Sequence, residues 1–496
     1  MKSSNRRASL VAGCLAVVAT AACGSNSVIG HQDGGAGAAG TGVNPGTAGV
    51  GGGGSGGTTG AAGNFGVGGD LIETGTAGVS GDAGSPGTAG ALGSAGVLGS
   101  AGVLGSAGVI GSAGTGGIED CRLGAGGTAG TSVAFLPAGA YPTNRFSSLV
   151  ALGDLNGDGI PDLITTNYFQ ADQAGMSGTG GFPASDGGSA SVFLSVASSG
   201  YAPARHYNVG YRPSSAAIGD LNDDGKPDVA VTNQQGTIVL LNDGTGALSV
   251  PVTYSTGTSP QWVAIGDLNG DGKGDLAVAN RGSAGGADVA VLLNIGNGMF
   301  SARNYPAGTS PIHVAIGDLN GDSKPDLVVS SGPSVSVLTN EGSGTFGAPA
   351  SYGAGTDPVS AAIGDLNGDG KPDLALGTAG HGTGVLLNIG SGVFAAAVIY
   401  PMPSWTISIG DLNRDGKPDL VSAPTIGADW RLSVPGRCGP VTFLPNAGNG
   451  TFGAYGSIGV TPEPLSVTVG DLNADGKADL AVSTADGVSV LLNAAP

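Results

Sequence analysis

Charged and aromatic residues are scarce in this 496-residue chain, at 11% and 5% of the sequence. Only 18 Lys and Arg stand against 37 Asp and Glu, which gives a formal net charge of −19. Because phosphate binding needs clustered basic side chains, this balance argues against a nucleic-acid partner. No apolar run reaches the roughly 20 residues that span a bilayer as a helix. Long helical periodicity is also lacking, and 99 glycines argue against a helix-rich or α/β enzyme.

The first 22 residues have the pattern of an export signal, with Lys2, Arg6 and Arg7 ahead of a short apolar stretch. The following Thr-Ala-Ala-Cys, which ends at Cys23, resembles the lipobox of bacterial lipoproteins. That resemblance implies that residues 1–22 are a signal peptide and that Cys23 is lipidated. Gly24 then favours export to the outer membrane or cell surface. The alternative is an ordinary secretory signal with an incidental Cys.

Residues 23–120 consist almost entirely of Gly, Ala, Ser, Thr and Val. Residues 92–114 repeat with a period of six, but they would form little more than one coil of a β-helix, too few to bury a core. The composition predicts a disordered tether, which as a random coil would span roughly 55 Å. Such a tether would hold a domain clear of a membrane surface.

Beyond residue 130 the chain is built from repeats that share one acidic motif, for example GDLNGDGKPDL at residues 364–374. The motif occurs seven times, and its first Asp is at Asp154, Asp220, Asp267, Asp318, Asp365, Asp411 and Asp471. The commonest spacing, about 47 residues, and three or four short strand patterns in each repeat are typical of a four-stranded propeller blade. We therefore predict an all-β domain at residues 121–496, a seven-bladed β-propeller. Two stacked sheets are the alternative.

The two ends of the repeat region predict how the ring closes. The last repeat stops after three strands, whereas residues 132–143 precede the first motif and resemble an outermost strand. An N-terminal strand that completes the last blade would remove its exposed edge.

The acidic motif reads D-x-N-x-D-G-x-x-D. A tight turn would explain Asn-Gly and Asp-Gly, but not the three Asp at positions 1, 5 and 9. Three carboxylates on one loop repel each other unless a cation neutralises them, and oxygen-only ligands around a glycine turn match Ca²⁺. The loops lack the position-12 Glu of an EF-hand. The predicted ligands are Asp154, Asn156, Asp158, Asp162, Asp220, Asn222, Asp224, Asp228, Asp267, Asn269, Asp271, Asp275, Asp318, Asn320, Asp322, Asp326, Asp365, Asn367, Asp369, Asp373, Asp411, Asn413, Asp415, Asp419, Asp471, Asn473, Asp475 and Asp479.

These loops between strands, together with stretches such as TFGAP at residues 345–349, resemble the FG-GAP/VCBS repeat family, which includes the integrin α-chain propeller. The resemblance covers residues 131–496. It implies up to seven structural Ca²⁺ ions on one face of the propeller and ligands on the opposite face. Ser323 replaces the position-6 Gly in the fourth loop, so we expect that site to be weak or distorted.

Of the remaining cysteines, Cys121 and Cys438 would form a disulfide across the closure, with two free thiols as the alternative. None of the common hydrolase or metalloprotease motifs is present, so we expect no catalysis.

Two repeats carry longer loops, at residues 167–188 and 423–439. Exposed aromatic and Arg side chains are typical binding anchors, although these aromatics could simply pack their own loops. The candidate ligand-binding residues are Tyr168, Phe169, Phe182, Trp262, His313, Trp405, Trp430 and Arg431. We expect a binding or adhesion module for a carbohydrate or protein, which reaches the membrane only through its lipid. The alternatives are an extracellular carbohydrate-active enzyme, similar to polysaccharide lyases, and a scaffold subunit.

Overall fold

The computed structural model describes residues 133–143, 146–168, 187–196, 200–282, 288–355, 357–379, 382–423, 439–460 and 463–495. Every regular element in these ranges is a β-strand, and no helix suited to crossing a membrane occurs among them. The predicted signal peptide, Cys23, the tether, Cys121 and Cys438 lie outside the described residues, so these remain predictions.

The described residues form seven four-stranded antiparallel sheets, which we number as blades 1 to 7 in the order of their acidic loops. Blades 1 and 2 consist of β2 (Phe146–Gly153), β3 (Asp162–Tyr168), β4 (Gly188–Phe193) and β7 (Arg205–Gly210), then β8 (Ser215–Gly219), β9 (Asp228–Asn233), β10 (Gly236–Leu240) and β11 (Val252–Tyr254). Blades 3 and 4 consist of β12 (Pro260–Gly266), β13 (Asp275–Asn280), β14 (Asp288–Gly296) and β15 (Met299–Pro306), then β16 (Pro311–Gly317), β17 (Asp326–Ser331), β18 (Ser334–Leu338) and β21 (Ala350–Gly353).

Blades 5 and 6 consist of β22 (Pro358–Gly364), β23 (Asp373–Thr378), β24 (Gly382–Leu386) and β27 (Val398–Tyr400), then β28 (Thr406–Gly410), β29 (Asp419–Ala423), β30 (Gly439–Leu444) and β31 (Gly456–Val460). Blade 7 consists of β32 (Pro464–Gly470), β33 (Asp479–Thr484), β34 (Gly487–Asn493) and β1 (Phe135–Pro142). Small hairpins join the third and fourth strands of blades 1, 4 and 5: β5 (Ser195–Val196) with β6 (Gly200–Tyr201), β19 (Asn340–Gly342) with β20 (Thr345–Phe346), and β25 (Asn388–Gly390) with β26 (Val393–Phe394).

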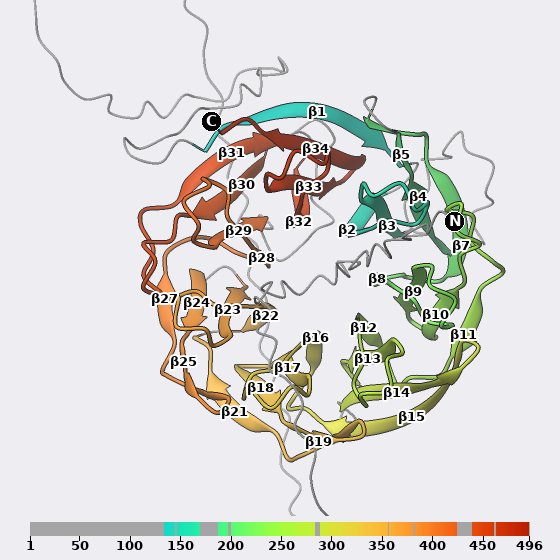
Figure 1. Cartoon of the computed structure of the whole chain (residues 1–496), viewed down its shortest axis with the longest axis horizontal. Coiled ribbons are helices and arrows are strands. Elements are labelled where there is room, and N and C mark those ends of the chain that lie inside the picture. The colour runs from blue at the N-terminus through green and yellow to red at the C-terminus, as the bar shows by residue number, and fades with distance from the viewer. Residues whose placement is uncertain are drawn as a thin grey trace, which may run out of the picture. The chain divides into compact units, whose positions relative to one another are not determined.

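The sheets are arranged radially around a central axis, with the first strand of each blade innermost (Figure 1). Burial follows this order. The second strands β9 and β13 are buried at every residue, whereas the outer strand β11 is largely exposed. The predicted seven-bladed propeller is therefore confirmed, and two stacked sheets are excluded.

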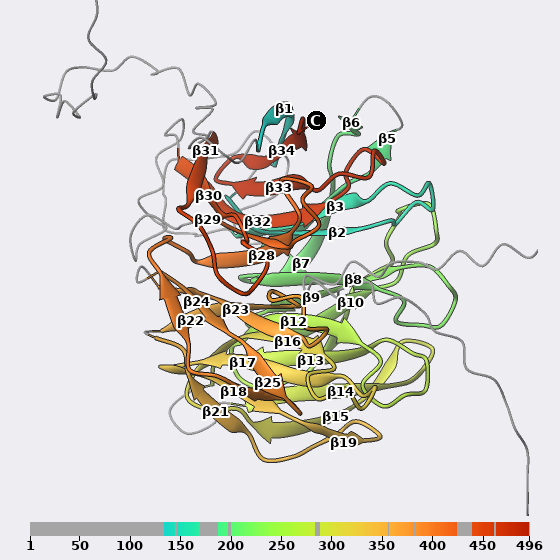
Figure 2. The same cartoon turned by 60° about the vertical axis from the view of Figure 1, so that its left-hand side comes forward.

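Strand β1 closes the ring, as predicted, by pairing antiparallel with β34 from Phe135↔Asn493 to Pro142↔Gly487. The two strands run side by side in both views (Figures 1 and 2). Tyr141 of β1 then packs edge-on against Tyr201 of blade 1, with ring centroids 5.2 Å apart. The same kind of contact joins blades 2 to 6 in turn, for example Tyr305 of blade 3 with Phe346 of blade 4 at 5.5 Å.

The hydrophobic core is divided among the spaces between neighbouring blades. One cluster joins Ile164 of blade 1 with Ile218 of blade 2, and another joins Leu163 with Val490 of blade 7. The glycine that ends each first strand lies in close contact with the next blade. A Cβ atom on Gly470 would lie 2.6 Å from Leu152 Cδ1, closer than real Cβ contacts come. These glycines allow seven sheets to meet around one axis.

Candidate functional site

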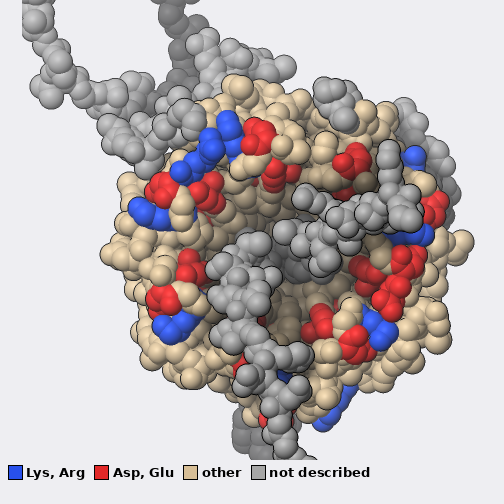
Figure 3. Space-filling model, viewed as in Figure 1, with Lys and Arg blue, Asp and Glu red and all other residues tan. Residues whose placement is uncertain are grey.

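Each acidic loop folds around its own first carboxylate. In the fifth loop, Asp365 accepts hydrogen bonds from the backbone N–H groups of Gly368, Asp369 and Gly370 at 2.7, 3.1 and 2.8 Å. Asn367 Oδ1 accepts from Asp369 N at 2.8 Å. Asp and Asn favour such bonds to the backbone a few residues further on, so the sequence itself specifies this turn. The face drawn in Figure 3 shows acidic side chains in clusters spaced around the ring.

The last Asp of each loop has a different environment, because it is buried. Asp373 accepts from Leu366 N at 3.0 Å through Oδ2 and from Asn388 N at 2.7 Å through Oδ1. Loss of solvation by burial raises the pKa of all seven of these carboxyls to about 6, namely those of Asp162, Asp228, Asp275, Asp326, Asp373, Asp419 and Asp479. A bound cation would favour the ionised form and so oppose this cost.

The seventh loop has the geometry that fits a cation best. Carboxylate oxygens of Asp471, Asp475 and Asp479 all lie within 4.8 Å of one another. Lys477 points away and donates to Ala495 O at 3.0 Å. In blades 2 to 6 the equivalent Lys instead pairs with the position-5 Asp, as Lys371 does with Asp369 at 2.7 Å. These exposed pairs contribute little to stability, so a cation could displace the ammonium group.

The fourth loop is not distorted, contrary to one of the two effects expected of Ser323. Ser323 adopts φ 66° and donates its N–H to Asp318 Oδ2 at 2.8 Å, as Gly370 does in the fifth loop. Position 4 is also left-handed, and non-glycine residues occupy it in three loops: Asp223, Arg414 and Ala474. The loop hydrogen bonds hold this backbone even without glycine. Weaker cation binding at the fourth loop remains a prediction.

The sequence analysis missed a buried Asn near the end of the third strand of each blade except the first. In blade 4, Asn340 Nδ2 donates to Leu268 O in the acidic loop of blade 3 at 2.8 Å and to Pro325 O at 2.9 Å. The same bond to the preceding blade is made by Asn242, Asn294, Asn388, Asn446 and Asn493. The recurring Leu-x-Asn near strand ends, most often Leu-Leu-Asn, was the available signal. These Asn residues tie the acidic loops of blades 1 to 6 each to the next blade.

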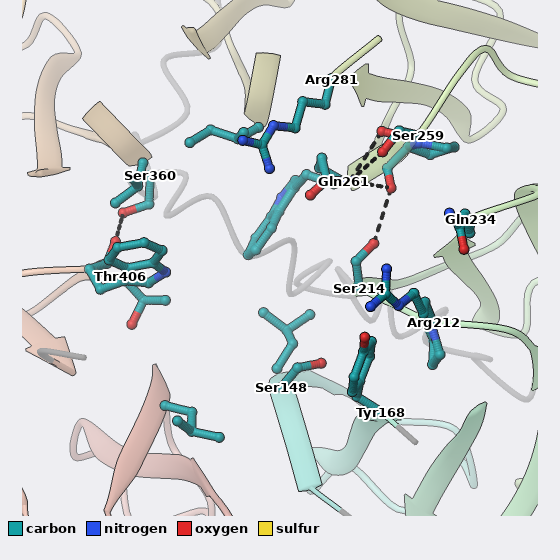
Figure 4. Close-up of a pocket in the computed structure, with 18 of the residues that line it drawn as sticks. Ser148, Tyr168, Arg212, Ser214, Gln234, Ser259, Gln261, Arg281, Ser360 and Thr406 are labelled. Atoms are coloured by element: carbon teal, nitrogen blue, oxygen red, sulfur yellow. Dashed lines mark hydrogen bonds between the residues drawn. The ribbon is translucent and has the colours of Figure 1, made fainter. Parts of the chain in front are cut away.

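A cavity of about 690 Å³ opens at the end of the propeller opposite the acidic loops. Residues at the beginnings of the first strands line it, and all seven blades contribute. Three of the predicted ligand-face residues line this cavity: Tyr168, Trp262 and Trp405. Figure 4 shows polar side chains such as Ser214, Gln234, Ser360 and Thr406 around the same space.

The other predicted ligand-face residues are placed differently. His313 is only 2% exposed and does not line the cavity, so the prediction that it contacts a ligand directly is wrong. It packs against Trp262 with ring centroids 4.2 Å apart, and burial lowers its pKa to about 3. The sequence could not show that Trp262 of the preceding blade covers it. Phe169, Phe182, Trp430 and Arg431 lie outside the described residues.

The closed ring of four-stranded blades and the repeated acidic loop define a β-propeller built from a sequence repeat. Models of the FG-GAP-like repeat match residues 220–278, 267–329, 318–376 and 365–422, and models of the FG-GAP repeat match 146–192 and 464–491. Together these matches cover more than half of the chain. The protein belongs to the FG-GAP repeat family, which indicates a binding or scaffold module. No curated protein matches its sequence.

Several solved structures are similar to the chain at low identity. One shows an Agrocybe aegerita lectin that recognises non-reducing terminal N-acetylglucosamine (19% identity, 62% of this chain and 87% of that chain, TM-score 0.40). Another is BBS1N in complex with ARL6DN (12%, 73% and 97%, TM-score 0.49). A third is the V. cholerae biofilm matrix protein Bap1 (12%, 74% and 92%, TM-score 0.41). These similarities carry no information on the ligand of this chain.

Proposed function

We propose that the protein is a calcium-stabilised, lipid-anchored binding module of the bacterial cell envelope, which binds a carbohydrate or protein ligand at the cavity opposite its acidic loops. The observation that carries this proposal is the cavity itself. Its flat aromatic side chains, Tyr168, Trp262 and Trp405, stand among hydroxyl and amide groups. Aromatic faces and convergent polar groups are what ligand sites commonly offer.

The residues that line the cavity favour binding without catalysis. None of the described residues that line the cavity is Asp, Glu or His, the side chains that most often transfer protons in glycan cleavage. Among the described residues, the one His near the cavity is His313, and it is buried behind Trp262. We therefore propose that a ligand held there is retained unchanged.

Calcium has a structural role in this proposal. The oxygen-only donors of each loop suit this cation, and their convergence in Asp471, Asp475 and Asp479 supports such a site. A bound ion would neutralise the carboxylates and brace the connection between the first two strands of a blade. The high calcium concentration outside a cell would then favour the folded propeller by mass action.

The anchor and the tether supply location. In the proposal, Cys23 carries the lipid and residues 24–120 hold the propeller away from the envelope, with reach but no fixed orientation. The test of this part is radiolabelled lipid incorporation with Cys23→Ser as the control. Equal labelling of the variant would refute the anchor.

The binding proposal is tested with the mature chain and a panel of cell-surface and environmental polysaccharides, by measuring both retention and product release. We expect retention without product, and loss of retention in Trp262→Ala and Trp405→Ala. Tyr455→Ala, at another exposed aromatic residue, is the matched control and should bind normally. Release of product would show that the protein is an enzyme. The absence of both retention and product release would indicate a protein partner.

A further inference from the structure

The charge inside the cavity has the opposite sign to that of the chain. The formal net charge of the protein is −19, yet the only charged side chains among the described residues that line the cavity are Arg212 and Arg281. A ring so rich in carboxylates elsewhere therefore presents two guanidinium groups at this end. Positive charge within a concave surface concentrates anionic ligands.

The backbone positions these two Arg residues in neighbouring blades. Arg212 precedes β8 of blade 2 and adopts φ 57°, an uncommon backbone conformation for a residue with a side chain. Its guanidinium lies 5.2 Å from the centroid of the Tyr168 ring. Arg281 follows β13 of blade 3, and its backbone N–H donates a hydrogen bond to the backbone oxygen of Ser259 at 3.0 Å. Figure 4 shows both Arg side chains at the cavity, with Gln261 and Ser214 in the same region.

Neither guanidinium forms an ion pair with a carboxylate of the described residues, although Lys side chains on the other face pair with Asp in five loops. Arg212 Nε is buried and has no hydrogen-bond partner there. Buried donors in folded proteins are nearly always paired, so an unpaired N–H at this position is unusual. The planar guanidinium group is suited to carboxylate in particular, because it donates two parallel hydrogen bonds.

We propose that the cavity binds an acidic glycan, with the carboxylate of a uronic-acid residue held by Arg212 and Arg281. This inference rests on the proposed binding function and names its ligand class. The ring of Trp262 offers a flat apolar surface for the C–H face of a pyranose. The hydroxyls of Ser148, Ser214 and Ser259 retain acceptor capacity for sugar hydroxyls, because each oxygen has two lone pairs. An acidic peptide shares the charge but not the need for this combination of flat rings and hydroxyl groups.

The experiment measures the affinity of the mature, calcium-loaded chain for two uronic-acid trisaccharides, of galacturonate and of mannuronate, by calorimetry. Each is compared with its carboxyl-reduced counterpart, which keeps the ring and its other hydroxyls. We expect at least one acidic trisaccharide to bind roughly tenfold more tightly than its reduced form, the scale of a charge-assisted hydrogen bond. Added salt should weaken the binding of the acidic form more than that of the reduced form.

The variants assign the effect to the two Arg residues. Arg212→Ala and Arg281→Ala should each reduce or abolish the preference for the acid. The matched control is Arg205→Ala on the outer strand β7, away from the cavity, which should keep that preference. Unchanged melting temperatures establish that each variant is folded.

Several outcomes would overturn the inference. Equal affinity for the acidic and reduced forms, or a preference that survives in both cavity variants, refutes it. Failure of both acidic trisaccharides to bind the folded protein refutes it as well. If neutral glycans are retained and Trp262→Ala releases them, the proposed binding function stands while the acidic ligand class fails. Binding of a poly-glutamate peptide in place of either sugar would reassign the cavity to protein ligands.

Discussion

Asn340 of blade 4 donates a hydrogen bond from Nδ2 to Leu268 O of blade 3, at 2.8 Å, across the boundary between two sheets. Its Oδ1 accepts from Gly342 N at 2.9 Å, and its side chain is 1% exposed. One side chain therefore satisfies backbone groups in two blades and connects neighbouring acidic loops mechanically. Neighbouring blades of a propeller have few covalent links. Hydrogen bonds such as this one therefore largely fix the position of one blade relative to the next.

The Asn340→Ala variant should lose stability because it leaves buried carbonyl and N–H groups without partners. We expect the free energy of unfolding to fall by about 2–3 kcal/mol, to be measured by chemical denaturation in calcium. Asn304→Ala, at an exposed outer-strand Asn, is the control and should change it by less than about 0.5 kcal/mol. An Asn340→Ala variant as stable as the control would show that the bond between blades contributes nothing.

Closure of the ring by β1 gives a second prediction. A chain that begins at residue 144 lacks β1 and exposes the edge of β34 together with the pocket of Phe135, which is 6% exposed. We expect a loss of about 3–5 kcal/mol, typical of removing a buried Phe, and association through the free edge. Chemical unfolding and size-exclusion chromatography measure the two effects. The matched chain begins at residue 131 and keeps β1. A monomer with unaltered stability after deletion would contradict this role for the strand.

The features that could be predicted from the sequence are those encoded locally. The acidic loop is specified by the hydrogen-bonding habits of residues such as Asp365 and Asn367, and strand patterns between loops set the number of blades. Contacts between residues of different blades could not be predicted from the sequence. Asn340 and Leu268 are 72 residues apart in the chain, and the partner of a buried Asn cannot be found from its neighbours. His313 was misjudged for the same reason, because Trp262 comes from another blade.

The residues that line the cavity were likewise predictable only in part. Trp262 and Trp405 could be placed at the correct end of the propeller, because they lie near the starts of first strands and those strands run towards the acidic loops. Arg212 and Arg281 were overlooked, since each is a single residue in a turn with no motif around it. Only the ring arrangement brings neighbouring turns together around one axis.

Calcium removal tests the role of the acidic loops. A chelator should lower the melting temperature of the mature chain, and calcium should restore it. A site saturated at one hundred times its Kd contributes about 2.7 kcal/mol, so several sites together would give a large shift. Asp475→Asn should lower the bound calcium, measured by atomic absorption, by one equivalent. Asp243→Asn, an exposed acid outside the loops, should leave the stoichiometry unchanged. An identical melt with and without chelator would remove calcium from the proposal.

Burial of His313 gives a pH dependence whose sign can be stated. Burial lowers its folded pKa to about 3, below the ordinary value of 6.5. The folded form therefore stays neutral while the unfolded chain takes up a proton below about pH 6.5, and the contribution of His313 to stability falls as the pH drops towards 3. At about pH 5 the loss should be about 2 kcal/mol relative to neutral pH.

The His313→Ser variant isolates this contribution, because Ser360 and Ser466 hold the equivalent register position in blades 5 and 7. The buried loop carboxyls act in the opposite direction, since their raised pKa gives stability that is lost as the pH rises through about 6. They are present in both proteins, so their effect cancels in the difference. The wild-type protein should lose stability relative to the variant between neutral pH and about pH 5. Parallel stability curves for the two proteins would mean that His313 is protonated in the folded state or reaches solvent.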